Sequence, residues 1–291
     1  ENLKSILKLM KSLFISIGII KKENPNVVIG FGNYITVPMI LASILTRTEY
    51  YLQEQNVKMG LANKLFYRFS QKIFLSFDKT FNKMPLKYNH KLMVTGNPIR
   101  KDFYLTDYKR ERENLKLGKD EKMVLIVGGS LGASTINQAI LSRWKDILKE
   151  KNIRIYWGTG KIGYKEINNQ VKNRKANDVI RPYFEKMAKV MTAADLVICR
   201  AGALTISELI ELQKPSILIP KFQMENARIL QEVNGAYIFE DDKIDEAIDK
   251  MFEIINDESK LSKMSSKLRV LKKGNAVDDI IDRLDIWREN R

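Results

Sequence analysis

Apolar residues recur along the first hundred positions in two alternating patterns. Residues 3–20 carry Leu, Ile, Met and Phe at helical spacing, with lysines between them. Short apolar runs at 27–29 and 50–56 predict strands, and the segments 38–43 and 59–72 predict helices. Because strands and helices alternate, we expect a parallel sheet covered by helices.

The same alternation continues over a longer stretch of the second part of the chain. Helical segments separate most of its apolar runs, which we predict to be strands at 123–130, 153–160, 179–184, 195–202, 216–220 and 236–239. Repeated strand–helix units build a doubly wound domain, and ligands of such domains bind beyond the carboxyl ends of the strands. The predicted fold class is therefore α/β, with a parallel sheet in each part of the chain and a doubly wound arrangement in the second.

The domain junction is predicted just before the charged run 107–122, which offers no apolar face to bury. We therefore divide the chain into a first domain, 1–102, and a second domain, 103–275. An amphipathic helix begins at position 276, and we expect the closing segment 276–291 to pack back on the first domain.

Composition excludes several classes of site. The chain has 291 residues, enough for two domains, and 44% of them are hydrophobic. The only cysteine, Cys199, rules out a disulfide framework and is expected to be buried in a strand. The only histidine, His90, rules out zinc sites built on paired histidines or on Cys/His clusters. The apolar runs are too short to span a bilayer.

The charge of +15 leaves several kinds of partner open. It fits a solvated basic surface, nucleic acid, an anionic membrane or a phosphorylated ligand. The helix at 3–20 packs on its own domain in the simplest interpretation. The alternative is that it also touches anionic lipid, with apolar insertion and lysine attraction acting together. The residues predicted to make that contact are Leu7, Lys8, Met10, Lys11 and Phe14.

The segment DLVICRAGALTISE (195–208) carries the most specific chemistry. An apolar strand runs into Arg200, a small-residue turn and a helix with Glu208 one turn inside it. A carboxylate there can accept two hydrogen bonds from the vicinal hydroxyls of a ribose, although it could also be a simple first-turn acid that favours the helix dipole. Gly202 would relieve crowding against a ligand, and Arg200 could pin the turn.

Two further motifs also follow predicted strands. VGGSLGAST (127–135) places Gly128, Gly129 and Ser130 between a strand and a helix, where amide groups can bind phosphate. It is neither a Walker A loop nor a good dinucleotide fingerprint, so alone it could be a tight turn. TGNPIR (95–100) places Arg100 at the predicted junction, where an arginine suits a diphosphate.

In this order and spacing the motifs resemble the MurG family of glycosyltransferases. The motifs that carry the resemblance are GFGNYITVP, LQEQN, TGNPIR, VGGSLGA, DLVICRAGALTISE and QMENA. The family transfers N-acetylglucosamine from UDP-GlcNAc to lipid I, which forms lipid II in peptidoglycan synthesis. The resemblance runs over nearly the whole chain and implies a GT-B fold, in which two Rossmann-like domains face each other.

The resemblance also implies roles for donor-site residues. Glu208 would hold the ribose, Ser130 the diphosphate, and Phe184 would lie beside the uracil. Arg100 would approach the diphosphate, and Asn56 the 4-hydroxyl of the sugar. The remaining donor contacts that it implies are Gly128, Gly129, Ala203, Leu204, Gln223 and Asn226.

On the acceptor side the chain departs from the family pattern. Asn33 replaces a glycine and is expected to adopt the same left-handed backbone, while Thr36 replaces a serine and keeps a hydroxyl. Gln53 replaces the histidine of the family's HEQN motif. This leaves Glu54 as the motif carboxylate that could act as general base. The other acceptor-side residues that the resemblance implies are Gly32 and Tyr34.

Two further departures from the family pattern concern segments that the family leads us to expect. The chain begins at Glu1, and the family's first glycine-rich loop, with its candidate base, would precede that position. The loop between Pro220 and Gln223 is several residues shorter than the family leads us to expect.

The expected activity is thus an inverting glycosyl transfer that needs no metal or other cofactor. The expected partners are UDP-GlcNAc, lipid I, an anionic inner-membrane surface and, as candidates, other cell-wall synthesis proteins. The expected location is the cytoplasmic face of the bacterial inner membrane, as a peripheral protein. The alternatives are another GT-B enzyme, either a glycolipid glycosyltransferase or a UDP-GlcNAc epimerase, and a basic nucleic-acid-binding protein. The last is disfavoured because the lysines are spread along the chain, so no nucleic-acid partner is expected.

Overall fold

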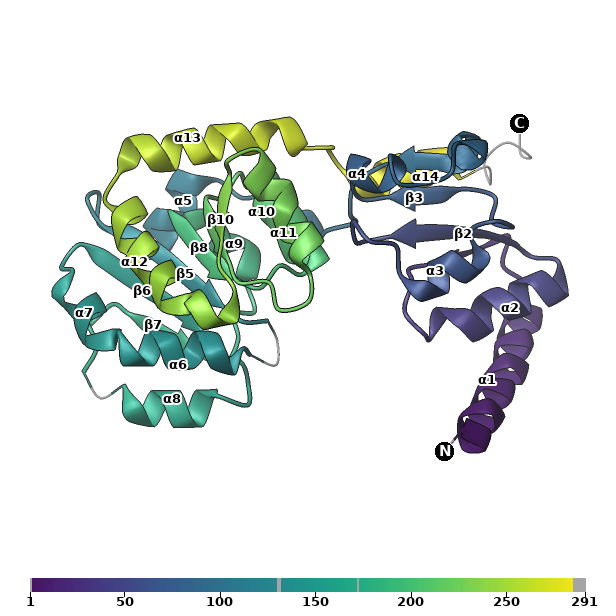
Figure 1. Cartoon of the computed structure of the whole chain (residues 1–291), viewed down its shortest axis with the longest axis horizontal. Helices are drawn as coiled ribbons and strands as arrows, with labels where there is room; N and C mark the ends of the chain where they lie inside the picture. The colour runs from purple at the N-terminus through teal and green to yellow at the C-terminus, as the bar shows by residue number, and fades with distance from the viewer. Residues whose placement is uncertain (1, 130–131, 172, 285–291) are drawn as a thin grey trace. The chain divides into compact units, whose positions relative to one another are not determined.

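A computed structural model describes residues 2–129, 132–171 and 173–284, with side chains from residue 7 onward. The chain forms two compact units, one made of residues 1–98 with 273–291 and the other of residues 99–272 (Figure 1). The boundary after Pro98 lies four residues before the one drawn from the sequence.

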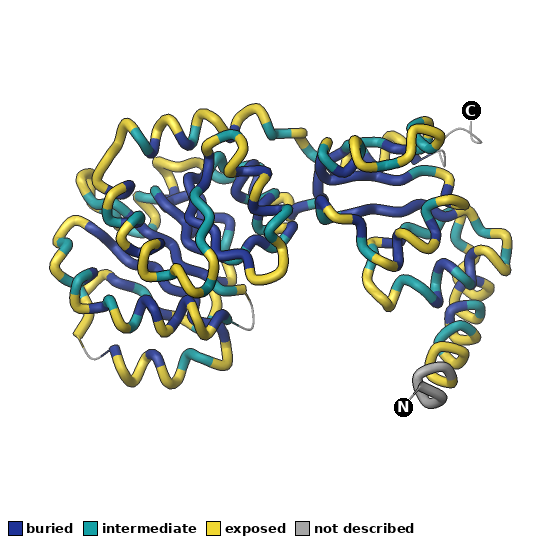
Figure 2. Tube along the Cα trace, in the orientation of Figure 1, coloured by how far each residue is buried: buried dark blue, intermediate teal, exposed yellow. Residues whose placement is uncertain are grey.

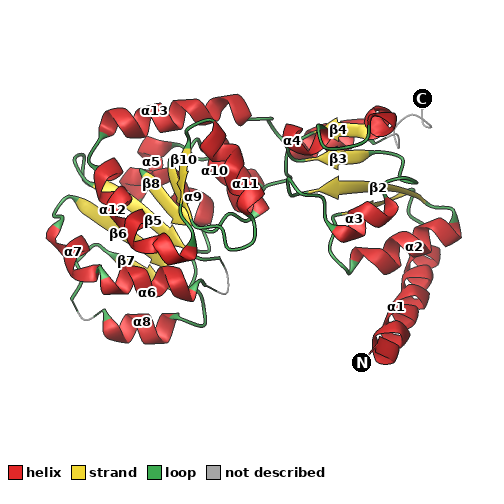
Figure 3. Ribbon diagram, in the orientation of Figure 1, coloured by secondary structure: helices red, strands yellow, loops and turns green. Residues whose placement is uncertain are grey.

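Unit 1 is built on a parallel sheet with the strand order β1-β2-β3-β4 (Figure 3). Its strands in the described part of the chain are β1 (Val27–Gly30), β2 (Glu49–Glu54), β3 (Ile73–Leu75) and β4 (Leu92–Val94). Its helices in the same residues are α1 (Asn2–Glu23), α2 (Thr36–Thr46), α3 (Leu61–Phe66), α4 (Asp78–Phe81), η1 (Leu86–Lys91) and α14 (Ala276–Arg283).

Helices cover both faces of the unit 1 sheet, because successive strand residues point to opposite faces. Ile73 packs with Ile40 and Phe66, which come from α2 and α3. On the other face, Phe74 packs with Ile280 and the residues around it on α14. The closing segment thus packs on the first domain's sheet, although residues 285–291 lie outside the described structure.

Unit 2 is a doubly wound domain with the strand order β10-β9-β8-β5-β6-β7, all parallel. Its described strands are β5 (Lys122–Val127), β6 (Ile153–Gly158), β7 (Val179–Arg181), β8 (Leu196–Cys199), β9 (Ser216–Leu218) and β10 (Ala236–Ile238). Its described helices are η2 (Lys101–Tyr104), α5 (Tyr108–Asn114), α6 (Ser134–Ser142), α7 (Trp144–Lys149), α8 (Tyr164–Gln170), α9 (Met187–Ala193), α10 (Ala203–Glu211), α11 (Met224–Glu232), η3 (Asp241–Lys243), α12 (Ile244–Ile255), α13 (Glu258–Leu268) and η4 (Arg269–Leu271).

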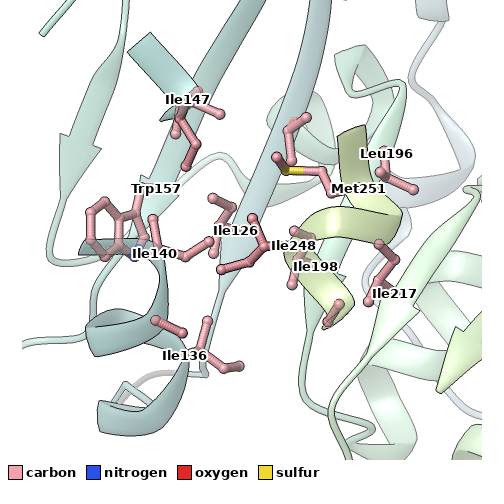
Figure 4. Close-up of a cluster of buried hydrophobic side chains, with 14 of the residues drawn as sticks. Ile126, Ile136, Ile140, Ile147, Trp157, Leu196, Ile198, Ile217, Ile248 and Met251 are labelled. Carbon is pink, nitrogen blue, oxygen red and sulfur yellow. The ribbon is translucent and has the colours of Figure 1, made fainter. Parts of the chain in front are cut away.

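The core of unit 2 is a continuous layer between the sheet and one set of helices (Figures 2 and 4). Strands β6, β8 and β9 are buried throughout, whereas the edge strands β7 and β10 are only partly buried. Ile126 and Ile198 from the sheet meet Ile140 of α6 and Met251 of α12. Trp157 is fully buried, and its indole nitrogen donates to Asn137 Oδ1 at 3.0 Å. This bond gives the polar end of the indole a partner, as burial requires.

The charged run 107–122 is more structured than its composition predicts. The run forms α5, in which Glu111 is buried. Side chains of α5 bind Asp195, the residue directly before β8. Arg112 Nη1 donates to Asp195 Oδ2 at 2.9 Å, and the Tyr108 hydroxyl donates to Asp195 Oδ1 at 2.7 Å. The charges of this run thus bind specific partners within unit 2.

Among the described residues, no helix has both the length and the apolar character that crossing a bilayer would require.

Candidate functional site

The strand order of unit 2 places a topological switch point between β5 and β8. From β5 the chain winds outward through β6 and β7, and then returns to β8 on the other side. At such a point the loops after the two central strands diverge, which leaves a crevice at their carboxyl ends where ligands bind. The glycine-rich turn after β5 and the Arg200–Gly202 turn after β8 both lie there.

The turn after β5 depends on its glycines. A Cβ on Gly128 would collide with the backbone nitrogen of Ala133, and Gly129 has a φ of +91°. Both conditions exclude larger residues, so the backbone can approach a ligand closely. The turn leads into α6, whose first amide groups lack partners within the helix. Ser130, the predicted diphosphate residue, lies outside the described residues.

The turn after β8 leads into α10 in the same way. Gly202 is extended and caps the helix, and Ala203 and Leu204 are its first two residues. Ala203 is buried, whereas Leu204 is exposed and lines a cavity of about 520 Å³. Two helix amino-terminal ends therefore lie at the switch point, an arrangement that favours bound anions.

Glu208 lies in the wall of this cavity, which we call the donor cavity. Burial raises the pKa of the Glu208 carboxyl to about 7; nearby Arg100 opposes the shift and Asp102 adds to it. A carboxyl half-ionised near neutral pH and facing a cavity is poised to accept hydrogen bonds from ligand hydroxyls, which would favour its charged form. Among the described residues at the switch point, Glu208 is the carboxyl group whose pKa is shifted most.

The structure brings Arg100 to the same cavity. Its side chain is half exposed and lies over the ring of Phe103, with Cζ 5.4 Å from the ring centroid. Arg100 Nη2 is 3.4 Å from Asp102 Oδ2. Because Arg100 belongs to unit 2, it shares a compact unit with Glu208 and the two helix termini.

Aromatic and methionine side chains also line the donor cavity. Phe184 is buried and stacks on Tyr156 with ring centroids 6.0 Å apart. Tyr183, Met187 and Met191 also line the cavity, and the sequence analysis did not assign them. The four-residue spacing of the methionines, directly after the predicted strand at 179–184, is the signal that could have identified them.

A second cavity, also of about 520 Å³, adjoins the donor cavity. Arg200 and Gln223 line both cavities, and Gly128 lines the second. Lys221 and Phe222, from the short loop after β9, complete its wall. The two cavities therefore meet at Arg200 and Gln223, between the glycine-rich turn and the start of α11.

Asn226 is not brought to either cavity. It is 2% exposed, and its Nδ2 donates to the Ala201 carbonyl at 3.3 Å. This bond fastens α11 to the turn after β8. The predicted contact between Asn226 and the sugar stays a prediction, and the observed bond gives the residue a structural role.

In unit 1, the turn after β1 has the predicted backbone. Gly32 and Asn33 have φ values of +79° and +69°, so the expectation that Asn33 adopts a left-handed conformation is confirmed. The Thr36 hydroxyl donates to the Gly32 carbonyl, and Asn33 Oδ1 accepts from the Tyr34 amide at 2.6 Å. Tyr34 is 77% exposed, which makes it available to an acceptor.

Glu54 is 2% exposed, and its carboxylate already holds several donors. Oε1 accepts from the backbone and side-chain nitrogens of Asn56 at 2.9 and 3.4 Å. Oε2 accepts from the Gly60 amide at 2.9 Å and from Asn63 Nδ2 at 2.8 Å. These bonds make Glu54 the link between β2, the following loop and α3. Its role as a general base stays a prediction, and this geometry favours a structural role.

The neighbours of Glu54 are similarly engaged. Gln53, which replaces the family's histidine, is fully buried and donates to Ser76 Oγ at 3.0 Å and to Asn97 Oδ1 at 3.3 Å. It therefore links the ends of β2 and β3 to the TGNP segment. Asn56 is partly buried beside Glu54, and its expected contact with the donor sugar stays a prediction.

The predicted membrane residues lie on the outer surface of α1. Leu7, Met10 and Phe14 are 61%, 45% and 67% exposed, and Lys8 and Lys11 are exposed between them. Further apolar side chains are exposed on this helix, namely Leu9, Ile15 and Ile19. So much exposed apolar surface on one helix is typical of an interaction site.

Within residues 7–129, 132–171 and 173–284, no three or more His, Cys, Asp or Glu side chains gather closely enough to hold an ion.

Comparison with known families matches both parts of the chain. The glycosyltransferase family 28 C-terminal domain matches residues 123–284, and the N-terminal domain of the same family matches residues 1–75.

One similar protein is a transferase of Fusobacterium nucleatum subsp. nucleatum. It is named UDP-N-acetylglucosamine–N-acetylmuramyl-(pentapeptide) pyrophosphoryl-undecaprenol N-acetylglucosamine transferase. The two sequences are 49% identical, and the alignment covers 99% of this chain and 82% of that protein.

Two solved structures are similar as well. Acinetobacter baumannii MurG superimposes with a TM-score of 0.72 at 26% identity, covering 95% of this chain and 78% of that one. The UDP-GlcNAc 2-epimerase from Neisseria meningitidis bound to UDP-GlcNAc also gives a TM-score of 0.72, at 16% identity and with 95% and 80% coverage. At that identity the likeness to the epimerase shows the fold alone.

Proposed function

The chain belongs to the MurG family of glycosyltransferases, and from that premise we propose the reaction it catalyses. It transfers N-acetylglucosamine from UDP-GlcNAc to undecaprenyl-pyrophosphoryl-MurNAc-pentapeptide (lipid I), giving lipid II. One structural observation carries this assignment. The donor cavity at the switch point of unit 2 combines a partly buried carboxylate with the amino-terminal ends of two helices.

This cavity supports specific roles for its residues. Glu208 accepts the two ribose hydroxyls, and the aromatic end around Phe184 holds the uracil. The diphosphate lies at the amino-terminal ends of α6 and α10, with Arg100 as its cationic neighbour. Fixed dipoles and a fixed cation of this kind stabilise charge as it develops, without reorganisation at the moment of reaction.

The chemical step is a displacement at the anomeric carbon. The lipid I sugar hydroxyl attacks from the face opposite UDP, so the configuration inverts, and the attacking hydroxyl loses its proton to a base. Charge on the departing UDP is held by the helix termini and Arg100, which is the basis for proposing that the reaction proceeds without a metal ion.

We further propose that the protein works at the surface of an anionic membrane, docked through α1. The exposed Leu7, Met10 and Phe14 supply apolar insertion, while Lys8 and Lys11 supply attraction to anionic lipid. This location suits an acceptor that carries a polyprenyl chain. The cytoplasmic face of the inner membrane is the proposed side, and other cell-wall synthesis proteins are proposed partners.

A transfer assay tests the reaction. Purified protein with radiolabelled UDP-GlcNAc and a short-chain lipid I analogue should give labelled disaccharide product, with and without a metal chelator. The same assay with UDP-GalNAc tests donor choice, because a site that hydrogen-bonds one hydroxyl configuration rejects the other. Hydrolysis or epimerisation of the donor without transfer to the analogue would reject the proposal.

A further inference from the structure

Arg200 lies at the meeting point of the two cavities, and its hydrogen bonds connect three separate elements. Its Nη2 donates to Thr135 Oγ1 at 2.6 Å, and its Nη1 is 2.8 Å from Asp241 Oδ1. The Thr135 hydroxyl in turn donates to the same Asp241 oxygen at 2.7 Å. A fourth bond runs from Arg200 Nη1 to the Ile219 carbonyl at 2.8 Å. The three side chains therefore form a closed triangle.

The positions of these residues in the fold give the triangle its significance. Thr135 is the second residue of α6, directly after the glycine-rich turn, and Arg200 is the first residue of the turn into α10. Asp241 begins η3, after β10. The triangle thus ties together the two helix amino-terminal ends that border the cavities.

The charge of Arg200 is already balanced within the triangle. Its side chain is 18% exposed, and that of Asp241 is 29% exposed. Burial acts to raise the pKa of Asp241, but hydrogen bonds from Thr135 and Arg200 outweigh it and hold that pKa below its ordinary value. The carboxylate is therefore charged at neutral pH, and a guanidinium paired with it has less attraction left for a phosphate.

We propose that Arg200, Thr135 and Asp241 form a clip that positions the two phosphate-binding turns, and that Arg200 acts as a positioning residue rather than as a diphosphate ligand. The inference rests on the proposed function, because the diphosphate is the group that the two turns receive. Anion binding by paired helix termini depends on their separation, and a small displacement of preorganised donors is costly.

The opposite assignment, in which Arg200 binds the phosphate directly, predicts the opposite effect of removing Asp241. Asp241→Asn would then release a paired arginine and strengthen UDP binding. If the clip positions the turns, the same substitution loosens α6 and weakens UDP binding by about tenfold. Uridine, which lacks the diphosphate, should keep its affinity within about twofold.

The experiment is calorimetric titration of UDP and of uridine into the wild type, Asp241→Asn and Thr135→Val. Both variants should lose affinity for UDP and keep affinity for uridine. Asp249→Asn is the matched control, since it breaks another arginine–aspartate pair of unit 2, with Arg143 at 2.8 Å, away from the cavities. Unchanged or tighter UDP binding by Asp241→Asn would overturn the clip.

Arg200→Lys provides a second test. A lysine keeps the charge but cannot hold three partners in one plane, so the clip predicts a loss as large as that of Arg200→Ala. Substantial rescue by lysine would favour direct phosphate binding and reject the clip.

Hydrogen exchange tests the clip without any ligand. The amides at the start of α6 should exchange faster in Asp241→Asn than in the wild type and in Asp249→Asn. Failure of the wild type to bind UDP would reject the donor assignment, whereas unchanged exchange in Asp241→Asn would reject the clip itself.

Discussion

At the scale of single residues, Glu208 makes donor binding depend on pH. Its pKa is raised to about 7 by burial, and ribose hydroxyls donate hydrogen bonds only to a carboxylate oxygen that is available to accept them. Binding should therefore lower this pKa and release a proton. The affinity for UDP-GlcNAc should rise by about tenfold between pH 6 and pH 8 in the wild type.

Calorimetry in buffers of different ionisation enthalpy measures both the affinity and the proton release. Glu208→Gln should bind more weakly and show little pH dependence over this range. A wild-type affinity that is flat from pH 6 to pH 8 would contradict the assignment of the carboxylate to the ribose.

The raised pKa of Glu208 makes the stability of the unliganded protein fall with rising pH, whereas the affinity for the donor rises. A raised pKa means that the folded state binds more protons than the unfolded state between about pH 4.5 and pH 7. The contribution of Glu208 to the free energy of unfolding should therefore fall by about 3 kcal/mol as the pH rises through this window. Denaturant unfolding of the wild type and Glu208→Gln at several pH values checks this, since the difference between the two proteins isolates the contribution of Glu208.

A substitution of Glu54 distinguishes two roles for this buried carboxylate, which are holding the loop after β2 in place and acting as the general base. Glutamine keeps its shape but turns an amide nitrogen toward one set of the donors that now face the carboxylate. We expect Glu54→Gln to lower the free energy of unfolding by about 2 kcal/mol. Denaturant unfolding measures this, with the exposed Glu49→Gln of the same strand as the control. Wild-type stability combined with a fall in kcat of about a hundredfold or more would instead identify Glu54 as the base.

At the scale of elements, the periodicity of apolar residues predicted most helices and strands. The turns between these elements supply residues of the donor cavity. The strands at 123–130 and 195–202, with their glycine turns, were predicted to end at a ligand, and both border the donor cavity. Neighbouring strands in a sheet are fixed by long-range pairing, so sequence alone could not show that β8 adjoins β5.

Other features depend on contacts that periodicity does not report. The helical segment between the predicted strands at 123–130 and 153–160 divides at Arg143 into α6 and α7. Asn226 follows the family motif but donates to the Ala201 carbonyl, and the carboxylate of Glu54 is occupied by three neighbouring residues. For Asn226 and Glu54, hydrogen bonds that the sequence pattern does not reveal decided the outcome.

Helix α1 should bind anionic vesicles through its exposed apolar residues. Changing Leu7, Met10 and Phe14 together to serine removes the inserted side chains and should lower vesicle binding by about tenfold or more. Sedimentation with vesicles that contain phosphatidylglycerol measures the change. The control is the serine triple variant of Leu105, Ile162 and Val270, which are at least as exposed but belong to unit 2. Equal loss in both variants, or none in the α1 variant, would contradict docking through α1.

At the scale of the whole molecule, basic charge is concentrated in the first part of the chain. Residues 1–98 contain 14 Lys and Arg against 5 Asp and Glu, so this segment carries +9 of the total +15. The same segment supplies most of unit 1, which holds α1 and the turn at Gly32. The excess of basic charge and the exposed apolar residues of α1 thus belong to unit 1, while the donor cavity lies in unit 2.

This distribution predicts that vesicle binding depends on salt. Raising the salt concentration from about 50 mM to about 500 mM screens the lysines and should weaken binding to anionic vesicles by about tenfold. Binding to neutral vesicles, measured in parallel, should be weak and insensitive to salt. Equal binding to both kinds of vesicle would show that charge has no part in docking.

The central claim is that the switch point of unit 2 is a site for UDP-GlcNAc. Calorimetric titration of UDP-GlcNAc into the wild type and Glu208→Ala, with a metal chelator present, tests it most directly. We predict clear binding by the wild type and a loss of affinity of about a hundredfold in the variant, since a partly buried carboxylate that holds two hydroxyls is removed. A folded wild type that does not bind, or equal binding by both proteins, would contradict the account.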